Sequence, residues 1–510
     1  MSDGAASHRG IITVCVMLAT IMQALDTTIA NVALPYMMGS LSATLDQINW
    51  VLTSYIVAAA ITIPLTGFLV ARFGRKPVFI VSVAGFTAAS VLCGFATSLD
   101  QMVLYRLLQG VFGAPLVPMS QSVLLDTYPR EKHGSAMAMW GVGVMVGPIL
   151  GPTLGGWLTE YYNWRWVFFI NVPIGALTLA GLFLYLSDTA RNIKIRFDFF
   201  GFICLGLAIG GLQMMLDRGE NLDWFSSTEI MLETGIAALA FYLFIVHTAT
   251  AENPFINPRI FADRNFSIGL VAMFVVGMIL LATMALLTPF LQQLMNYPVL
   301  TAGIVLAPRG VGTMIAMLIV GRLTNRADPR LLFTIGLLFI AFTLWEMMYY
   351  TPDVSEGALI RTGIIQGFGL GFVFVPLSTV TFATLDPQYR TQATALFSLM
   401  RNIGSSIGIS VVIFLLTRNT SIMHAELAAH VTPFNLGLHL PNLGQLWDMT
   451  AIAGKAALNA EITKQASVVA YANDYLLMMY VTLAALPLAF FLKRPPRQGG
   501  APAAAAAVAD

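Results

Sequence analysis

Residues 67–76 read GFLVARFGRK, and residues 321–330 read GRLTNRADPR. The second stretch repeats the pattern Gly-x-Leu-x-x-Arg-x-x-x-Lys/Arg of the first, 254 residues later. A Gln-Gly pair at 109–110 likewise returns at 366–367. Chance recurrence of Gly and Arg in loops is the alternative, but the common spacing favours a parallel duplication. Parallel repeats of this type build transporters whose site lies between the halves, near the middle of the membrane.

The composition of the chain indicates that lipid is its solvent. Of the 510 residues, 57% are apolar and 10% are charged, whereas a soluble domain carries roughly 25% charged residues. A soluble core cannot bury so large an apolar fraction. The net charge of +1 argues against nucleic acid as a partner, because phosphate binding requires a concentrated basic face. The fold class expected is therefore an all-α membrane protein.

Fourteen segments are long and apolar enough to cross a bilayer, which requires roughly 20 residues each. They lie near residues 11–33, 48–70, 77–97, 101–125, 135–158, 165–187, 199–216, 229–250, 266–290, 301–322, 329–350, 358–384, 392–416 and 472–492. The first segment reads as a retained helix, because no small-residue cleavage site follows it.

The basic residues orient these spans, since cytoplasmic loops are enriched in Lys and Arg. With the N-terminus inside, the cytoplasmic segments hold 18 of the 27 basic residues. The opposite loops at 35–47 and 291–300 hold none. Both termini are expected in the cytoplasm, and the protein in the inner (cytoplasmic) membrane. The cytoplasmic set comprises Arg9, Arg72, Arg75, Lys76, Arg130, Lys132, Arg191, Lys194, Arg196, Arg259, Arg264, Arg322, Arg326, Arg330, Arg390, Lys493, Arg494 and Arg497.

The repeat divides the fourteen spans into six, two and six. We expect an N-terminal half at 1–190, two inserted helices with their linkers at 191–264, and a C-terminal half at 265–494. A long loop at 418–471 lies outside, and the tail at 495–510 is expected to be disordered. Residues 423–430 and 452–470 within the loop look helical and mildly amphipathic. The loop is either a loosely structured connector or a docking surface for an extracytoplasmic partner.

Three segments resemble the signatures of drug:proton antiporters in the major facilitator superfamily. They are the first-helix segment 25–35 (LDTTIANVALP), the fourth-helix segment 106–114 (RLLQGVFGA) and the fifth-helix segment 143–156 (GVMVGPILGPTLGG). Segments 164–175 (WRWVFFINVPIG) and 401–408 (RNIGSSIG) are similar to the fourteen-helix branch of that family. Segment 216–227 (LDRGENLDWFSS) narrows the resemblance to EmrB-type exporters. Together the similarities cover residues 11–492.

This resemblance implies a major facilitator fold and a proton-coupled antiporter that exports hydrophobic or amphipathic compounds by alternating access. The proton gradient drives it, without a cofactor. It further implies a periplasmic adaptor of the EmrA type (a membrane fusion protein) and an outer-membrane channel of the TolC type as partners. An uptake permease for a small metabolite is the alternative, although the fifth-helix glycines disfavour it. A membrane enzyme or scaffold fits less well, because the six histidines are scattered and metal spacing is missing.

Asp26 and Arg106 are the candidate proton-coupling residues. Ionisable groups inside spans are costly and usually functional. Asp26 lies roughly 10 Å, and Arg106 roughly 8 Å, below the outer face at about 1.5 Å per residue. Desolvation favours the protonated form of a carboxyl group, whereas a neighbouring guanidinium favours its ionised form. We therefore hypothesise that Asp26 binds the proton and that Arg106 tunes the proton affinity of Asp26. A static ion pair between helices is the alternative.

Two further motifs suggest moving parts. The gating motif of the fifth helix comprises Gly143, Gly147, Pro148, Gly151, Pro152, Gly155 and Gly156. Small residues permit close helix approach, and proline removes a backbone donor, so this helix is expected to bend or slide against the opposite half; close packing alone is the alternative.

The cytoplasmic loop motif comprises Gly67, Arg72, Gly74, Arg75 and Lys76. Ala71 replaces the acidic residue usual in the family, which leaves the bracing of the cytoplasmic gate in doubt.

A wide, mostly apolar cavity is expected between the halves. Such a cavity accepts many amphipathic molecules, because apolar contacts discriminate poorly among substrates. The candidate lining residues are Gln23, Asn31, Gln109, Trp140, Phe290, Phe397 and Arg401. Trp50 is a weaker candidate. Asp126, near a helix end, is expected to be interfacial, and Glu346 and Arg361 are expected to form a structural ion pair.

Overall fold

The protein is a bundle of long helices. The computed structural model describes residues 9–189, 191–193, 195–324, 326–432, 434, 447 and 451–493. Within these residues, thirteen helices are long and apolar enough to cross a membrane, or fourteen if the bent pair α4–α5 is counted as one span. The predicted fourteen spans thus have their counterparts in the structure.

The first set of helices, α2–α11, surrounds Asp26. Polar residues such as Ser98, whose side chain accepts from the Gln101 amide, cap helix starts. Proline lacks a backbone donor, and the chain bends by 55° between α4 and α5, next to Pro64. The set comprises α2 (Arg9–Ser40), α3 (Leu45–Ile48), α4 (Trp50–Thr62), α5 (Leu65–Phe73), α6 (Arg75–Phe95), α7 (Leu99–Gly113), α8 (Leu116–Thr127), α9 (His133–Tyr161), α10 (Trp166–Phe169) and α11 (Asn171–Tyr185).

A pair of helices follows, α12 (Phe199–Arg218) and α13 (Thr228–Thr250). The second set then comprises α14 (Arg264–Pro289) with the π-helical turn η5 (Phe290–Leu294), α15 (Val299–Leu323), α16 (Pro329–Met347), α17 (Glu356–Ala383), α18 (Arg390–Ala429), α20 (Ile452–Ala484) and α21 (Leu486–Phe491). The predicted division at residues 190, 264 and 494 remains our interpretation of these two sets and the pair between them.

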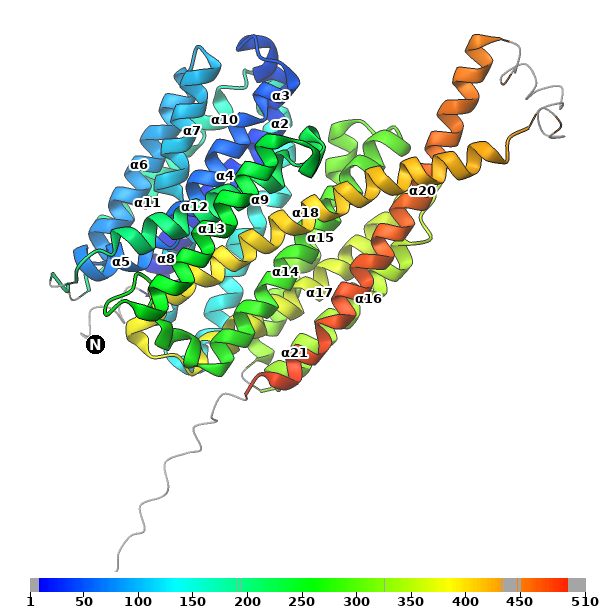
Figure 1. Ribbon diagram of the computed structural model, residues 1–510. Coiled ribbons are helices and arrows are strands. Elements are labelled where there is room, and N and C mark those ends of the chain that lie inside the picture. The colour runs from blue at the N-terminus through cyan, green and yellow to red at the C-terminus, as the bar shows by residue number, and fades with distance from the viewer. Residues whose placement is uncertain are drawn as a thin grey trace, which may run out of the picture.

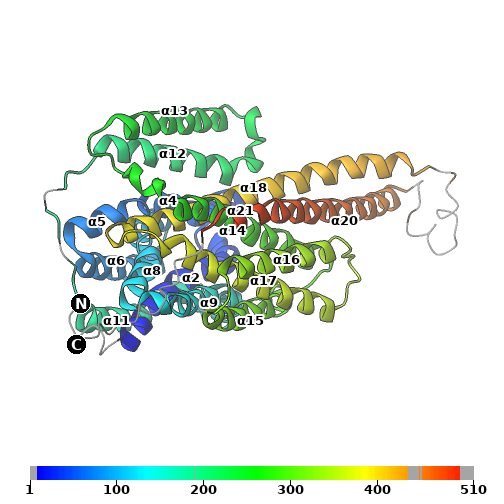
Figure 2. The same ribbon diagram turned by 90° about the horizontal axis from the view of Figure 1, so that it is seen from below.

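The two sets stand side by side in Figure 1, with α2–α11 in blue and cyan and α14–α21 in green to red. Helix α9 of the first set packs along α15 of the second. On the other side of the bundle, α12 contacts both α4 and α18 (Figure 2). The inserted pair therefore covers the seam between the sets opposite to α9 and α15.

We call the end of the bundle that holds the α5–α6, α8–α9 and α17–α18 connections the basic end. At the other end, α18 and α20 are longer than the predicted spans and project together beyond the neighbouring helices (Figures 1 and 2). We call this projection, residues 417–429 and 452–471, the helical hairpin. The helical prediction for 423–430 and 452–470 is thus confirmed. The middle of the predicted loop (435–446) and the tail at 495–510 lie outside the described residues.

Candidate functional site

The Asp26 carboxylate is held inside the first set by three side chains. Arg106 Nη1 donates to Oδ2 at 2.6 Å. Gln109 Nε2 and Asn171 Nδ2 donate to Oδ1 at 2.7 and 3.0 Å. Asp26 is only 1% exposed, and its three partners are fully buried. Helices α2, α7 and α11 thus meet at one carboxylate, which is buried and accepts hydrogen bonds at both of its oxygens.

The guanidinium of Arg106 has its own set of partners. Its Nε donates to Val51 O at 3.0 Å, and Nη1 also donates to Gln109 Oε1 at 2.8 Å. The guanidinium carbon lies 4.4 Å from the centre of the Tyr55 ring, a favourable cation–π distance. Helix α4 therefore also stabilises the charge of Arg106, through the Val51 carbonyl and the Tyr55 ring.

A second layer of polar groups positions the first. Asn171 Nδ2 also donates to Ser90 Oγ at 3.0 Å, and Ser90 Oγ donates to Phe168 O at 2.8 Å. Sequence reasoning placed Asn171 inside a motif but did not assign it to the site, and it missed Ser90. A polar side chain in the middle of an apolar span was the available signal. The network can serve as a switch, because protonating Asp26 removes the charge that Arg106 pairs with.

The glycines of α9 pack against α2, the helix that carries Asp26. Gly143, Gly147, Gly151 and Gly155 face α2 residues 17–32, and Thr28 Oγ1 donates to Gly147 O at 3.0 Å. The opposite half, which we expected these glycines to face, instead meets another side of α9, where Pro152 and Ile149 lie against Gly303 and Gly310 of α15. Pro148 and Pro152 lie within one continuous helix. Helix α9 thus connects the Asp26 helix to the second set.

Gly147→Ala is expected to weaken this packing. A Cβ there would lie 2.5 Å from the carbonyl carbon and oxygen of Ala24, so α2 and α9 must move apart, at a cost of about 1–3 kcal/mol. The matched control is Gly156→Ala, because no atom lies within 4 Å of a Cβ at that position. Thermal unfolding in detergent should show a lower Tm for the first variant alone. Equal Tm values for both would contradict this close contact.

The cytoplasmic loop motif lies at the basic end. Gly67 packs against Gln392 of α18, where a Cβ would approach within 3.0 Å. Gly74 has a φ of +91°, which an L side chain rarely adopts. Lys76 Nζ donates to Phe183 O at 2.7 Å. Arg72 donates to Ile193 O and Ile195 O at 3.1 and 2.7 Å, so this arginine binds the linker that follows α11.

Asp126 braces the basic end between the two sets. Its carboxylate pairs with Arg75 of the first set and, at 2.5 Å, with Arg390 Nη1 of the second. Ser122 and Thr391 form a hydrogen bond of 3.1 Å beside it. An acid is thus present at this end although position 71 is alanine, whose carbonyl accepts from the Asn192 amide at 2.9 Å. The expectation that Asp126 is merely interfacial missed this contact between the sets.

Asp126→Asn is expected to loosen the closed basic end. Each partly exposed ion pair contributes up to about 1 kcal/mol, so losing two raises the open population by about 5–30-fold. The rate at which a hydrophilic maleimide labels Ser122→Cys measures this opening, and the three native cysteines are buried. The control is Asp188→Asn, whose partner Arg191 lies on the same linker. Unchanged labelling in Asp126→Asn would argue against the brace.

The remaining cavity candidates are distributed over both sets. Gln23 donates to Tyr55 Oη at 3.2 Å beside the Arg106 site, and Asn31 is exposed. Trp140 is buried and stacks on Phe374 across the two sets, with ring centres 5.5 Å apart.

The second-set candidates have different neighbours. Phe290 is buried against Tyr350 and Tyr471. Phe397 is buried against Phe382. Arg401 is half-buried on α18. That these candidates line a substrate cavity stays a prediction.

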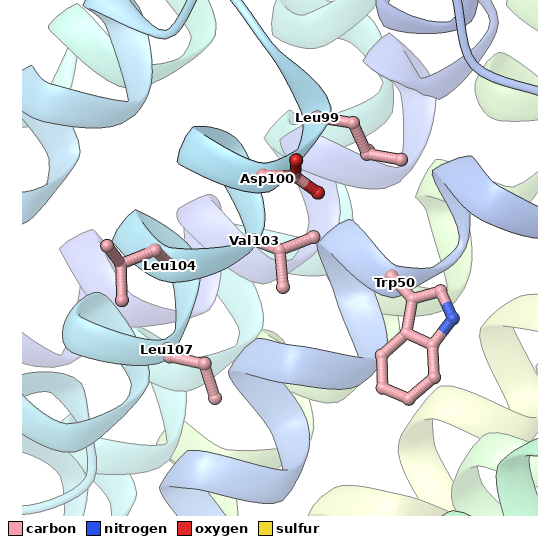
Figure 3. A pocket seen from close by; sticks show the side chains of 6 residues that line it. All are labelled: Trp50, Leu99, Asp100, Val103, Leu104 and Leu107. Atoms are coloured by element: carbon pink, nitrogen blue, oxygen red, sulfur yellow. The ribbon is translucent and has the colours of Figure 1, made fainter.

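A surface pocket of about 320 Å³ lies between α4 and α7 (Figure 3). It is lined by Trp50, Leu99, Asp100, Val103, Leu104 and Leu107. Trp50 also lies under the Arg218 guanidinium of α12, 5.2 Å from the ring centre. The weaker candidate Trp50 is therefore placed at this peripheral pocket and at the inserted pair. As predicted, Glu346 and Arg361 form an ion pair.

Residues 16–409 match the family model described as Major Facilitator Superfamily. The chain is 38% identical over 498 residues to the multidrug export protein EmrB of Escherichia coli K12, covering 96% of each chain. It is 37% identical over 494 residues to the fatty acid resistance protein FarB of Neisseria gonorrhoeae, covering 96% of this chain and 97% of the relative.

Solved structures show the same fold. The human organic anion transporter MFSD10 (TETRAN) matches with a TM-score of 0.58 at 15% identity, over 92% of this chain and 99% of its own. A bacterial homologue of the lysosomal transporter Spinster matches with a TM-score of 0.54 at 18% identity, over 97% and 100%. The predicted all-α membrane protein of the major facilitator fold is confirmed.

Proposed function

Since the chain belongs to the Major Facilitator Superfamily, we propose that it is a multi-pass secondary transporter that exports hydrophobic or amphipathic compounds in exchange for protons. The observation that carries the coupling is the buried ion pair between Asp26 and Arg106. Relatives that cover nearly the whole chain are named for multidrug export and fatty acid resistance, which supports export over uptake of a metabolite.

The coupling mechanism follows from the charge of Asp26. While ionised, the carboxylate holds Arg106, Gln109 and Asn171 together. A proton on the carboxylate removes its attraction to Arg106. The guanidinium would then be a buried charge without a partner, which is costly, so a rearrangement of α2 and α7 is favoured. Helix α9 transmits this movement, because its glycine face contacts α2 and its other side contacts α15.

The sidedness of the protein follows from its loop charges. We assign the basic end to the cytoplasm, with both termini there, and the membrane to the inner membrane. The ion pairs of Asp126 then close the cytoplasmic end. In this assignment the conformation is closed toward the cytoplasm, and a proton approaches Asp26 from the outside as the substrate leaves.

The proposal is tested in proteoliposomes with an imposed pH gradient. Hydrophobic fluorescent compounds, ethidium among them, are expected to move against the proton gradient and to stop when nigericin collapses it. A panel that varies charge and size then defines the substrate class. Transport of every compound at the same rate with and without the gradient would overturn proton coupling.

The helical hairpin is our candidate surface for the periplasmic adaptor, which in turn would connect to an outer-membrane channel. It exposes apolar side chains, among them Ile422, Leu427, Ile452 and Val469. Such exposure beyond the spans indicates a protein contact. The two helices lie close together there, since His424 Nε2 is 2.9 Å from Asn459 Oδ1.

Because of this proximity, a short Gly-Ser linker can replace residues 425–458 without separating the helices. The shortened protein is expected to lose co-purification with the adaptor but to keep its transport in proteoliposomes, which contain no adaptor. Ile422→Ser with Val469→Ser is a milder variant that keeps the hairpin length. Full adaptor binding by the shortened protein would rule out this surface.

A further inference from the structure

The second set contains a buried carboxylate that the Asp26 site does not use. Asp474 lies on α20, which packs against α14, α16 and α18. It is 1% exposed, and its Oδ2 has no hydrogen-bond partner. In the part of the chain that the structure describes, Asp474 takes part in no ion pair. Buried polar atoms are almost always paired, so an unpaired carboxylate oxygen in a membrane bundle requires an explanation.

Arg309 and Tyr475 also carry buried polar atoms that have no hydrogen-bond partner. Arg309 of α15 is 4% exposed; its Nη2 donates to Leu280 O at 3.3 Å, while its Nη1 has no partner. The buried hydroxyl of Tyr475 has none either. Tyr475 is within electrostatic range of both Asp474 and Arg309. We call these three groups the cluster: Asp474 and Arg309 each interact electrostatically with Tyr475, but they do not interact with each other in this conformation.

The surroundings of Asp474 supply no other charge to balance it. The titratable groups facing the cluster are Tyr471 on α20 itself and Tyr350 after α16. Phe290 packs on both of these rings. Behind Tyr350 lie Glu346 and Arg361, which already pair with each other. Helices α14 and α18 contribute no charged side chain to the cluster's electrostatics.

Burial decides the protonation state of such a carboxyl. An isolated ionised carboxylate in an apolar interior costs far more than a neutral polar group, and it takes up a proton instead. We propose that Asp474 is a second proton-binding site, occupied in this conformation, and that Arg309 replaces the proton as its partner in the alternate conformation.

The position of Arg309 connects this site to movement of the two sets. Gly310, the next residue on α15, packs against Ile149 of α9. In the proposed mechanism, a shift of α9 against α15 displaces this segment of α15 within the second set and brings Arg309 toward Asp474 on α20. Arrival of the guanidinium favours the ionised carboxylate and releases the proton. The role in transport rests on the proposed antiport, but the protonation of Asp474 does not.

Dicyclohexylcarbodiimide tests the site directly, because it reacts with protonated carboxyl groups in apolar surroundings. The purified full chain is treated over a range of pH, and the modified residues are identified by mass spectrometry. Asp474 is expected to be labelled at neutral pH, with labelling lost as pH rises. Asp26, which is paired with Arg106, is expected to remain unlabelled. This measurement requires no substrate and no transport, so a failure of the proposed function leaves it interpretable.

Three variants sharpen the result. Asp474→Asn should lose the label at this peptide, whereas Glu346→Gln, the matched change at a neighbouring carboxylate, should retain it. Arg309→Gln should extend Asp474 labelling to higher pH, because the competing cation is gone. Size-exclusion elution and Tm confirm that each variant is folded. An unlabelled Asp474 at every pH, or identical pH profiles with and without Arg309, would overturn the proposal.

Discussion

Replacing Arg106 by alanine is expected to lower the free energy of unfolding by about 3–5 kcal/mol, because the change leaves the buried Asp26 charge without its cation. Gln109 and Asn171 still donate to the carboxylate, but neutral donors do not balance its charge. Chemical denaturation in detergent micelles measures the loss.

The matched control is Arg361→Ala, which breaks an ion pair in which the Arg361 side chain is 64% exposed; its expected cost is at most about 1 kcal/mol. The double variant Arg106→Ala with Asp26→Asn should recover part of the loss, since no unpaired charge remains. If Arg106→Ala lowered the free energy of unfolding no more than Arg361→Ala does, the Asp26–Arg106 pair would contribute no more to stability than an exposed ion pair.

Asp26→Asn is expected to reduce pH-gradient-driven efflux to the background of empty vesicles. Asparagine keeps the size and part of the hydrogen bonding of Asp26, so the helices around it should stay together. Asparagine cannot bind and release a proton at this position, so the pH gradient can no longer drive transport through it. Initial rates of ethidium movement in proteoliposomes provide the measurement.

Two comparisons separate coupling from folding. Asp100→Asn removes a carboxylate at the peripheral pocket and should leave efflux unchanged. Exchange of labelled for unlabelled ethidium at equal pH requires no net proton movement and should persist in Asp26→Asn. Gradient-driven efflux at the wild-type rate in Asp26→Asn would eliminate this residue as the proton carrier, and the ion pair would then be structural.

Similar membrane depth was enough to relate Asp26 to Arg106, and the structure places the two side chains in contact. Depth follows from position along a helix, which the sequence gives directly. The sequence does not give the rotation of each helix about its axis. For this reason Asn171 and Ser90 were not predicted to belong to the site. The same limit explains the glycines of α9, whose spacing revealed a close contact without revealing that α2 is the partner.

Contacts between the two sets could not be predicted from the sequence, for another reason. Asp126 and Arg390 are 264 positions apart, and no local pattern relates them. Asp474 stands near the start of the predicted span 472–492, a position at which an acid commonly faces water. The continuous helix from Ile452 to Ala484 instead carries it into the bundle.

Lipid as the solvent, the number of spans, the likeness to one transporter family and the pairing candidate Asp26 could all be predicted from the sequence alone. Hydropathy and charge are properties of single residues, so the linear sequence shows them directly. The pairing of charges, the contacts of Asp126 with both sets, and the unpaired atoms of Asp474 and Arg309 come from the three-dimensional packing alone. Pairing depends on how helices turn toward one another, and packing of whole helix faces settles that rotation.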